Sequence, residues 1–439
     1  MLNKFFDKLV FTLLLCISVF IPAFSQDEEV GAEVKASAQY TSEIEKLAKN
    51  KKIQNAFQFI QSQRELNRKE LIMLTEIPAP PFKEENRASK FAIMLREAGA
   101  DSIWIDAVGN AVGIRKGTKR NKTVVLDAHL DTVFPETTDV TVKFKGDTLY
   151  APGIGDDTRG LVMVVSVLRA LEKAQIETDA DILFIGTVGE EGLGDLRGVK
   201  HLFTVNKPKI DSWIAIDGGD IGRVNNKGLG SYRYRITFKG PGGHSWGAFG
   251  LANPQHALGS AIHYFTKAAD EFTKTGVRTS YNVGRIGGGT SINSIAFESW
   301  MEIDMRSESP DRLVQIESIL KTSVQKALEE HNAMKRRGPD LTVDVNKIGD
   351  RPSGELPESL PLIQRSIAVA SFFGETPRLT RGSTNSNIPI AKGIPAVTIG
   401  RGGKSGGAHS LSEWWYDDDG YKAIQLALLT LVAEAGIGK

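Results

Sequence analysis

Five short segments of this 439-residue chain carry histidine or acidic side chains beside strand-like runs or in glycine-rich turns. In chain order they are His129-Leu130-Asp131, Asp156-Asp157, Glu190-Glu191, Asp217-Gly218-Gly219 and Gly407-Ala408-His409. Ligands of open α/β sheets bind at the carboxyl ends of the strands, so side chains at such positions are expected to meet. Two imidazoles, single carboxylates and a glutamate pair match the needs of two zinc ions and a general base. The set predicts one two-metal site built from separate loops.

Each segment also has an ordinary explanation when it stands alone. His129 at the end of an apolar run is compatible with a hydrogen-bonded histidine at a strand end. Asp156-Asp157 precedes the apolar run 160–170, and acidic residues favour a helix start. Glu190-Glu191 is compatible with a solvated acidic turn, although adjacent like charges after a buried strand favour a nearby cation. Only the ordered combination is specific.

Strand-like and helical runs alternate up to Asp217, which predicts βαβ units and a mainly parallel sheet, the α/β class. The helices expected at the start are 42–61, 65–74 and 84–98. From Ser231 the order becomes β-α-β-β-α-β, the ferredoxin-like arrangement. His409 follows this middle unit whereas the other four segments precede it. A single site therefore requires the flanks to form one domain with the middle inserted.

The expected divisions are a signal peptide at 1–25, a linker at 26–40, a catalytic domain at 41–230 and 350–439, and an inserted domain at 231–349, which the family resemblance described next implies is a lid or dimerisation domain.

The five segments resemble those of the dizinc metallopeptidases and amidohydrolases that include peptidase T, carboxypeptidase G, succinyl-diaminopimelate desuccinylase and the aminoacylases. The resemblance extends from about Ser42 to the C-terminus. It implies that His129 and Asp217 bind one zinc, that Glu191 and His409 bind the other, and that Asp156 bridges both. It also implies that Glu190 is the general base. Asp131 would orient the His129 imidazole. The resemblance further implies a cis peptide bond between Asp156 and Asp157.

The middle of the chain extends the resemblance. His244, in Gly240-Pro241-Gly242-Gly243-His244-Ser245, is similar to a family histidine that reaches the metals of a neighbouring subunit, which implies a homodimer through the inserted domain. Asn293 and Arg306 match residues that bind a substrate carboxylate, and a guanidinium offers two parallel donors for that purpose. The ordinary alternatives are a loop histidine, a turn asparagine and a strand-end arginine.

The sequence departs from the family pattern in two places. The basic residue after the bridging aspartate is shifted by one position, to Arg159 in Asp156-Asp157-Thr158-Arg159-Gly160. A late loop that often ends in aspartate reads Ser383-Thr384-Asn385. Neither change removes an expected metal ligand.

The N-terminus has the pattern of an export signal. Lys4 and Lys8 lie beside the apolar run 10–20, and Ala23-Phe24-Ser25 offers small residues for cleavage before Gln26. The chain is therefore expected to be exported, periplasmic or secreted, with no membrane contact after cleavage. An uncleaved anchor is the alternative. The net charge of +1 gives no reason to expect nucleic acid as a partner.

These features predict zinc-dependent hydrolysis of amide bonds in short peptides, with Co²⁺ or Mn²⁺ as possible substitutes. Asp217-Gly218-Gly219 favours the peptidase T branch, and so an aminopeptidase or a di- or tripeptidase. One alternative is a carboxypeptidase or N-acyl-amino-acid deacylase, whose substrate would be an N-acyl amino acid. An alternative of another class is an exported binding protein that has lost catalysis.

Overall fold

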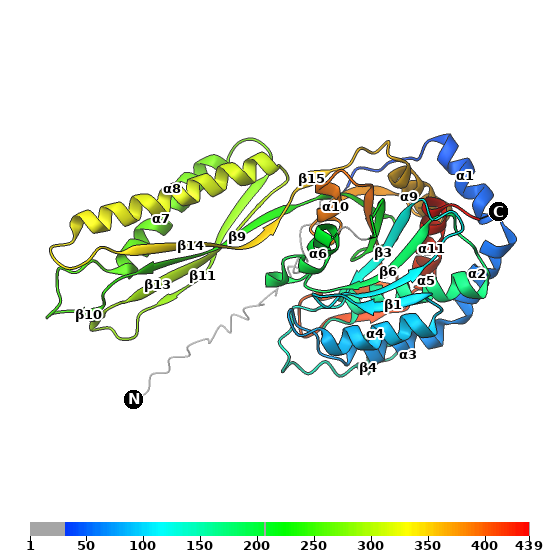
Figure 1. The fold of residues 1–439 in the computed structure, drawn as a ribbon, viewed down its shortest axis with the longest axis horizontal. Coiled ribbons are helices and arrows are strands. Elements are labelled where there is room, and N and C mark those ends of the chain that lie inside the picture. Colours follow the sequence, from blue (N-terminus) through cyan, green and yellow to red (C-terminus); the bar gives the residue numbers. More distant parts are fainter. Residues whose placement is uncertain (1–30, 206–207, 439) are drawn as a thin grey trace, which may run out of the picture.

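The computed structural model describes residues 31–205 and 208–438, so the predicted signal peptide lies outside the described residues. Figure 1 shows a rounded α/β unit and an elongated second unit that projects from it. None of the helices in the described ranges combines the length and the apolar character that crossing a bilayer requires.

The rounded unit is built on a nine-stranded sheet in the order β1-β2-β6-β3-β7-β17-β8-β15, with β16 also paired to β8. Its strands are β1 (Ser102–Ile105), β2 (Ala111–Arg115), β3 (Thr123–His129), β6 (Asp181–Thr187), β7 (Ser212–Ile216), β8 (Arg223–Gly228), β15 (Gly354–Glu355), β16 (Arg378–Gly382) and β17 (Ala396–Ile399). The central strands β6, β3, β7 and β17 run parallel, whereas β1, β2 and β15 pair antiparallel at the edges. The predicted α/β class is confirmed, with a parallel centre and antiparallel margins.

Helices cover both faces of this sheet because its central strands are buried and apolar on both sides. They are α1 (Ala38–Ala48), α2 (Lys51–Ser62), α3 (Arg64–Thr75), α4 (Glu85–Glu97), α5 (Gly160–Lys173), α6 (Arg197–Val205), α9 (Pro361–Phe372), α10 (Asn387–Ala391) and α11 (Tyr421–Ala435). Alternate residues of β3 join different apolar clusters. Val124 packs in the cluster with α5 and α11, and Val125 packs in the cluster with α6 and α10. The sheet is therefore the shared wall between two cores.

The helix expected over 42–61 is wrong as a single element. The structure divides this region into α1 and α2 at Lys49 and Asn50. The Asn50 side chain accepts a hydrogen bond from the Lys52 backbone N–H at 2.9 Å, which caps the start of α2. Asn50 was the local signal for this break.

The elongated unit consists of β9 (Gly230–Lys239), β10 (Gly243–His244), α7 (Pro254–Thr273), β11 (Thr279–Gly288), β12 (Ser294–Ile295), β13 (Glu298–Ser307), α8 (Pro310–Met334) and β14 (Thr342–Arg351). Its main sheet has the antiparallel order β11-β13-β9-β14. Burial alternates along β13, because one face of the sheet packs against α7 and α8 (Figure 1). Ser231 and Arg351 are paired partners, so the chain enters and leaves this unit at one place.

A small four-stranded sheet, which the sequence did not predict, joins two distant parts of the rounded unit. Its order is β18 (Lys404–Gly406), β19 (Trp414–Tyr416), β5 (Thr148–Tyr150) and β4 (Lys143–Lys145). The loop between β18 and β19 carries His409, and the chain after β5 leads to Asp156. The pairing of β19 with β5 therefore brings His409 close to Asp156.

Candidate metal centre

Three neighbouring parallel strands deliver three of the predicted segments to one edge of the sheet. β3 ends at His129, β6 is followed by Glu190 and Glu191, and β7 is followed by Asp217. Because β6, β3 and β7 run in the same direction, their carboxyl ends lie together.

Asp156 is the centre of the cluster. Its Oδ1 lies 3.2 Å from His129 Nε2, and its Oδ2 lies 3.2 Å from His409 Nε2. His409 Nε2 also lies 2.9 Å from Glu191 Oε1. Ligand atoms of His129, Asp156 and Glu191 all lie within 4.8 Å of one another. The two oxygens of one carboxylate thus face two different imidazoles, which is the arrangement expected of a bridging ligand.

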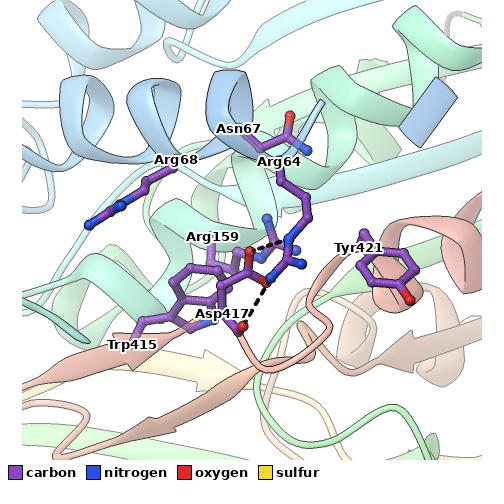
Figure 2. Close-up of a pocket in the computed structure, with 7 residues that line it drawn as sticks. All are labelled: Arg64, Asn67, Arg68, Arg159, Trp415, Asp417 and Tyr421. Atoms are coloured by element: carbon purple, nitrogen blue, oxygen red, sulfur yellow. Dashed lines mark hydrogen bonds and ion pairs between the residues drawn. The ribbon is translucent and has the colours of Figure 1, made fainter. Parts of the chain in front are cut away.

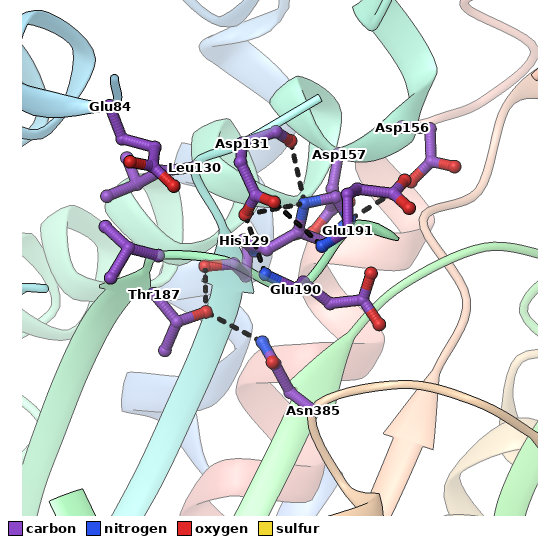
Figure 3. A network of polar contacts seen from close by, with 12 residues as sticks. Glu84, His129, Leu130, Asp131, Asp156, Asp157, Thr187, Glu190, Glu191 and Asn385 are labelled. Carbon is purple, nitrogen blue, oxygen red and sulfur yellow. Dashed lines mark hydrogen bonds and ion pairs between the residues drawn. The ribbon is translucent and has the colours of Figure 1, made fainter. Parts of the chain in front are cut away.

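Asp131 supports the cluster differently from the prediction. His129 Nδ1 lies 2.9 Å from the Asp131 carbonyl oxygen, whereas the Asp131 carboxylate is 3.8 Å away. A carbonyl can only accept, so Nδ1 carries the proton and Nε2 is left free to bind a metal. The carboxylate instead accepts the backbone N–H groups of Glu190 and Glu191, at 2.9 and 2.7 Å (Figure 3). Asp131 therefore fixes the glutamate pair with its side chain and the imidazole with its main chain.

Glu190, the predicted base, is held by an arginine that the sequence did not reveal. Arg351 Nη1 lies 3.0 Å from Glu190 Oε1 and 3.0 Å from Ser383 Oγ, and Arg351 Nη2 donates to the Glu190 carbonyl. Burial raises the pKa of Glu190 to about 8, against the opposing charge of Arg351. Arg351 ends β14, so the base is tied to the strand through which the chain leaves the elongated unit.

The loop that carries Asp156 is held by Glu413, a second residue that sequence reasoning missed. The Glu413 carboxylate accepts the backbone N–H groups of Gly153, Gly155 and Asp156, each at 2.8 Å. The peptide bond between Asp156 and Asp157 is cis, as the family resemblance predicts. A lone acidic residue next to strand β19 was the only local sign of this support.

Asp217 reaches the cluster beside a third unpredicted residue, Arg401, which follows β17. Arg401 Nη1 lies 3.0 Å from Asp156 Oδ1, 3.3 Å from Asp157 Oδ1 and 3.9 Å from Asp217 Oδ1. Burial raises the pKa of Asp217, and the charge of Asp156 raises it further.

The donor set fits divalent cations of the zinc type. Imidazole nitrogen and carboxylate oxygen are common zinc ligands, and the His129 tautomer already presents Nε2 to the cluster. The carboxylates of Asp156, Glu191 and Asp217 lie close together in a largely buried site, where the negative charge of Asp156 raises the pKa of Asp217. Bound cations would offset that charge.

Within one chain, the structure places His244 and Asn293 away from this cluster (Figure 1). His244 ends β10, and Asn293 precedes β12. These two short strands pair with each other at the end of the elongated unit that is remote from the nine-stranded sheet (Figure 1). Arg306 lies near the other end of β13, opposite Ser231, and bonds to Asp304 at 2.7 Å. A strand advances about 3.3 Å per residue, so Asn293 and Arg306 of the same chain do not meet around one carboxylate.

Both departures from the family pattern have a physical explanation. Arg159 turns away from the metal cluster. Its guanidinium lies 4.9 Å from the Trp415 ring centre and donates to the Gly420 carbonyl at 2.7 Å (Figure 2). Asn385 donates to the Asp127 carboxylate and to Thr187 Oγ1 below the glutamate pair. An aspartate at 385 would place two carboxylates in contact there.

Comparison with known proteins agrees with this geometry. The family model for peptidase family M20/M25/M40 matches residues 125–433. A Pyrococcus abyssi protein named as a LysW-lysine/LysW-ornithine hydrolase is 36% identical over 337 residues, which cover 75% of this chain and 82% of that protein.

Two solved structures share the fold. The aminopeptidase PepT of Bacillus cereus matches with a TM-score of 0.65 and 20% identity, covering 85% of this chain and 99% of its own. The Bacillus subtilis YXEP protein, a dinuclear metal-binding peptidase of family M20, matches with a TM-score of 0.60 and 16% identity, covering 86% and 100%. The chain belongs to peptidase family M20/M25/M40 and is a metallopeptidase-type hydrolase of that family.

Proposed function

We propose that this chain hydrolyses amide bonds of short peptides, as an aminopeptidase or a di- or tripeptidase, with two divalent cations, zinc being the first choice. The observation that carries the proposal is Asp156, whose two oxygens face His129 and His409 at equal distances. In this proposal His129 and Asp217 hold one cation, Glu191 and His409 hold the other, and Asp156 is shared.

The bound cations would polarise the amide carbonyl and lower the pKa of water. Glu190 takes the proton from the attacking water and passes it to the leaving amine. Arg351 holds the Glu190 carboxylate in position, and Ser383 Oγ in turn accepts a hydrogen bond from Arg351 Nη1. Asp131 keeps the Glu190 backbone at the strand end through the hydrogen bond at 2.9 Å.

A second copy of the chain would supply His244, because β10 lies far from the cluster of its own chain (Figure 1). His244 of the partner subunit would donate a hydrogen bond to the oxyanion that forms on the attacked carbonyl. Asn293 would arrive with it, since the Ser245 N–H donates to the Asn293 carbonyl at 2.9 Å. The proposed enzyme is therefore a homodimer through the elongated unit.

The second candidate is a carboxypeptidase or N-acyl-amino-acid deacylase with the same metal chemistry. The likeness to a protein named as a LysW-lysine/LysW-ornithine hydrolase favours it. A panel of free tripeptides, N-blocked dipeptides and N-acyl amino acids separates the two. An aminopeptidase or a di- or tripeptidase should have its highest kcat/KM on free tripeptides or dipeptides, and kcat/KM should fall strongly when the N-terminus is blocked. A higher kcat/KM on N-acyl amino acids would favour the carboxypeptidase or deacylase instead.

We also propose that the protein is exported, with residues 1–25 removed, on the basis of the charged start, apolar run and small residues before Gln26. N-terminal sequencing of the protein from its native host tests this. The expected first residue is Gln26, and an intact Met1 on soluble protein would contradict the proposal.

A further inference from the structure

Arg401 introduces a permanent positive charge into the candidate metal centre. It follows β17, the parallel neighbour of β7, and its side chain is about nine-tenths buried. An arginine guanidinium keeps its proton under all ordinary conditions. The aspartates of the cluster therefore already face one cation that belongs to the chain itself.

This charge lies on one side of Asp156. Arg401 Nη1 approaches Asp156 Oδ1 at 3.0 Å, the oxygen that also faces His129. The other oxygen faces His409 at 3.2 Å. Among the ion pairs of the described residues, Arg401 reaches Asp156, Asp157 and Asp217, and none joins it to Glu191.

The expected metal ligands are also spaced unevenly: most of them lie close together, and Asp217 lies apart. Atoms of His129, Asp156 and Glu191 lie within 4.8 Å of one another, and His409 contacts two of these residues. Asp217 is outside that compact group and has the Arg401 guanidinium 3.9 Å from its Oδ1. A cation bound through Asp217 must share Asp156 Oδ1 with Arg401, whereas a cation between Glu191 and His409 need not.

Like charges a few ångströms apart repel strongly where water is largely excluded. We propose that Arg401 makes the two metal-binding steps unequal: the position between Glu191 and His409 takes up the first divalent cation tightly, and binding of the second, at the position of His129 and Asp217, is weakened by competition with the Arg401 guanidinium. This inference rests on the metal assignment of the proposed function. It makes occupancy of the second position depend on the free metal concentration.

The test is a Zn²⁺ titration of metal-free full-length protein against a chromophoric chelator, with the bound metal checked by mass spectrometry after equilibrium dialysis. The wild type should bind two ions per chain in steps whose dissociation constants differ by about tenfold or more. Arg401→Met should tighten the second step by about tenfold and change the first less. Arg401→Lys keeps a charge and should retain unequal steps.

Arg159→Met is the matched control, because Arg159 is also a buried arginine near the Asp156 loop. Its guanidinium donates to the Gly420 carbonyl and contacts Trp415 rather than the metal-binding carboxylates. This variant should leave both steps unchanged. If Arg401→Met is not folded by circular dichroism, Arg401→Gln removes the same charge with a polar side chain.

An unchanged or weaker second step in a folded neutral variant would overturn the inference, since Arg401 would then only support Asp156 and Asp217. Two equally tight steps in the wild type would overturn it as well, while leaving the proposed function intact. Absence of any tight divalent cation binding by the wild type would instead defeat the proposed function.

Discussion

Three buried side chains that bind no cation in this account hold the metal ligands and the base in place. Glu413 fixes the backbone before Asp156, the Asp131 carboxylate fixes the backbone of the glutamate pair, and Arg351 fixes the Glu190 carboxylate. Charged groups hydrogen-bonded to backbone N–H make stronger contacts than neutral pairs do. The positions of the ligands are therefore determined by a layer of charge-assisted hydrogen bonds beneath them.

Asn385 belongs to this layer, and its amide is matched to the Asp127 carboxylate. Burial raises the pKa of Asp127 to about 7, which the hydrogen bond from Asn385 opposes. Asn385→Asp should replace this contact with two buried carboxylates and destabilise the protein by about 1–3 kcal/mol. The double variant Asp127→Asn/Asn385→Asp restores an amide–carboxylate pair and should recover much of the loss.

The sign of the pH dependence follows from the raised pKa. A carboxyl pair that holds a proton more tightly when folded loses stability as pH rises through its folded-state pKa. The deficit of Asn385→Asp should therefore be larger near about pH 8 than near about pH 6. Denaturant unfolding of the single and double variants at both pH values checks this, and a single variant as stable as the parent at the higher pH would contradict it.

At the scale of elements, the elongated unit is attached at one point and has its own core. The buried residues of its hydrophobic cluster all lie between Tyr234 and Leu341, and its first and last strands pair at Ser231 and Arg351. Antiparallel partners can be joined by a two-residue turn such as Asn-Gly.

Replacing residues 232–350 with Asn-Gly should therefore leave the rounded unit folded and able to bind metal, because Arg351 and the nine-stranded sheet remain. Peptide hydrolysis should fall by about 10²–10³-fold, the usual cost of losing an oxyanion donor such as His244. The measurements are metal content, thermal unfolding and kcat, with His244→Ala in the full chain as the control. Undiminished hydrolysis by the shortened protein would contradict the role given to the elongated unit.

The strand-end ligands could be predicted from the sequence because each ends or follows a local apolar run, as His129 ends β3. Their supports could not, since the contacts depend on segments far apart in the chain. Glu413 and Asp156 are separated by 257 positions and meet only because β19 pairs with β5. Asn293 and Arg306, which the resemblance links to a substrate carboxylate, lie at different ends of the elongated unit within one chain, so their shared role stays a prediction. Local pattern predicts which residues end a strand, and topology decides which of them meet.

At the scale of the whole molecule, the distance between His244 and the metal cluster predicts a site shared between two copies of the chain (Figure 1). The variants His244→Ala and Glu190→Gln should each be inactive. After subunit exchange, half of the dimers are mixed and each has one intact site, so about a quarter of the wild-type activity should return. Labelled subunits verify the exchange. No recovery after verified exchange would mean that His244 acts within its own chain or only supports the loop.

The central claim is that a cluster of histidine and carboxylate ligands binds divalent cations while Glu190 moves the proton. Glu190 hydrogen-bonds to Arg351 and is absent from the compact ligand group, so its role is separable from metal binding. The most direct measurement determines metal content and peptide hydrolysis on the same samples of wild type and Glu190→Gln, before and after chelation and zinc addition. The account predicts that chelation abolishes wild-type activity, that zinc restores it, and that Glu190→Gln keeps its metal but loses at least about 10²-fold in kcat. A Glu190→Gln enzyme that remains active while its metal content falls, or a metal-free wild type that hydrolyses at full rate, would contradict it.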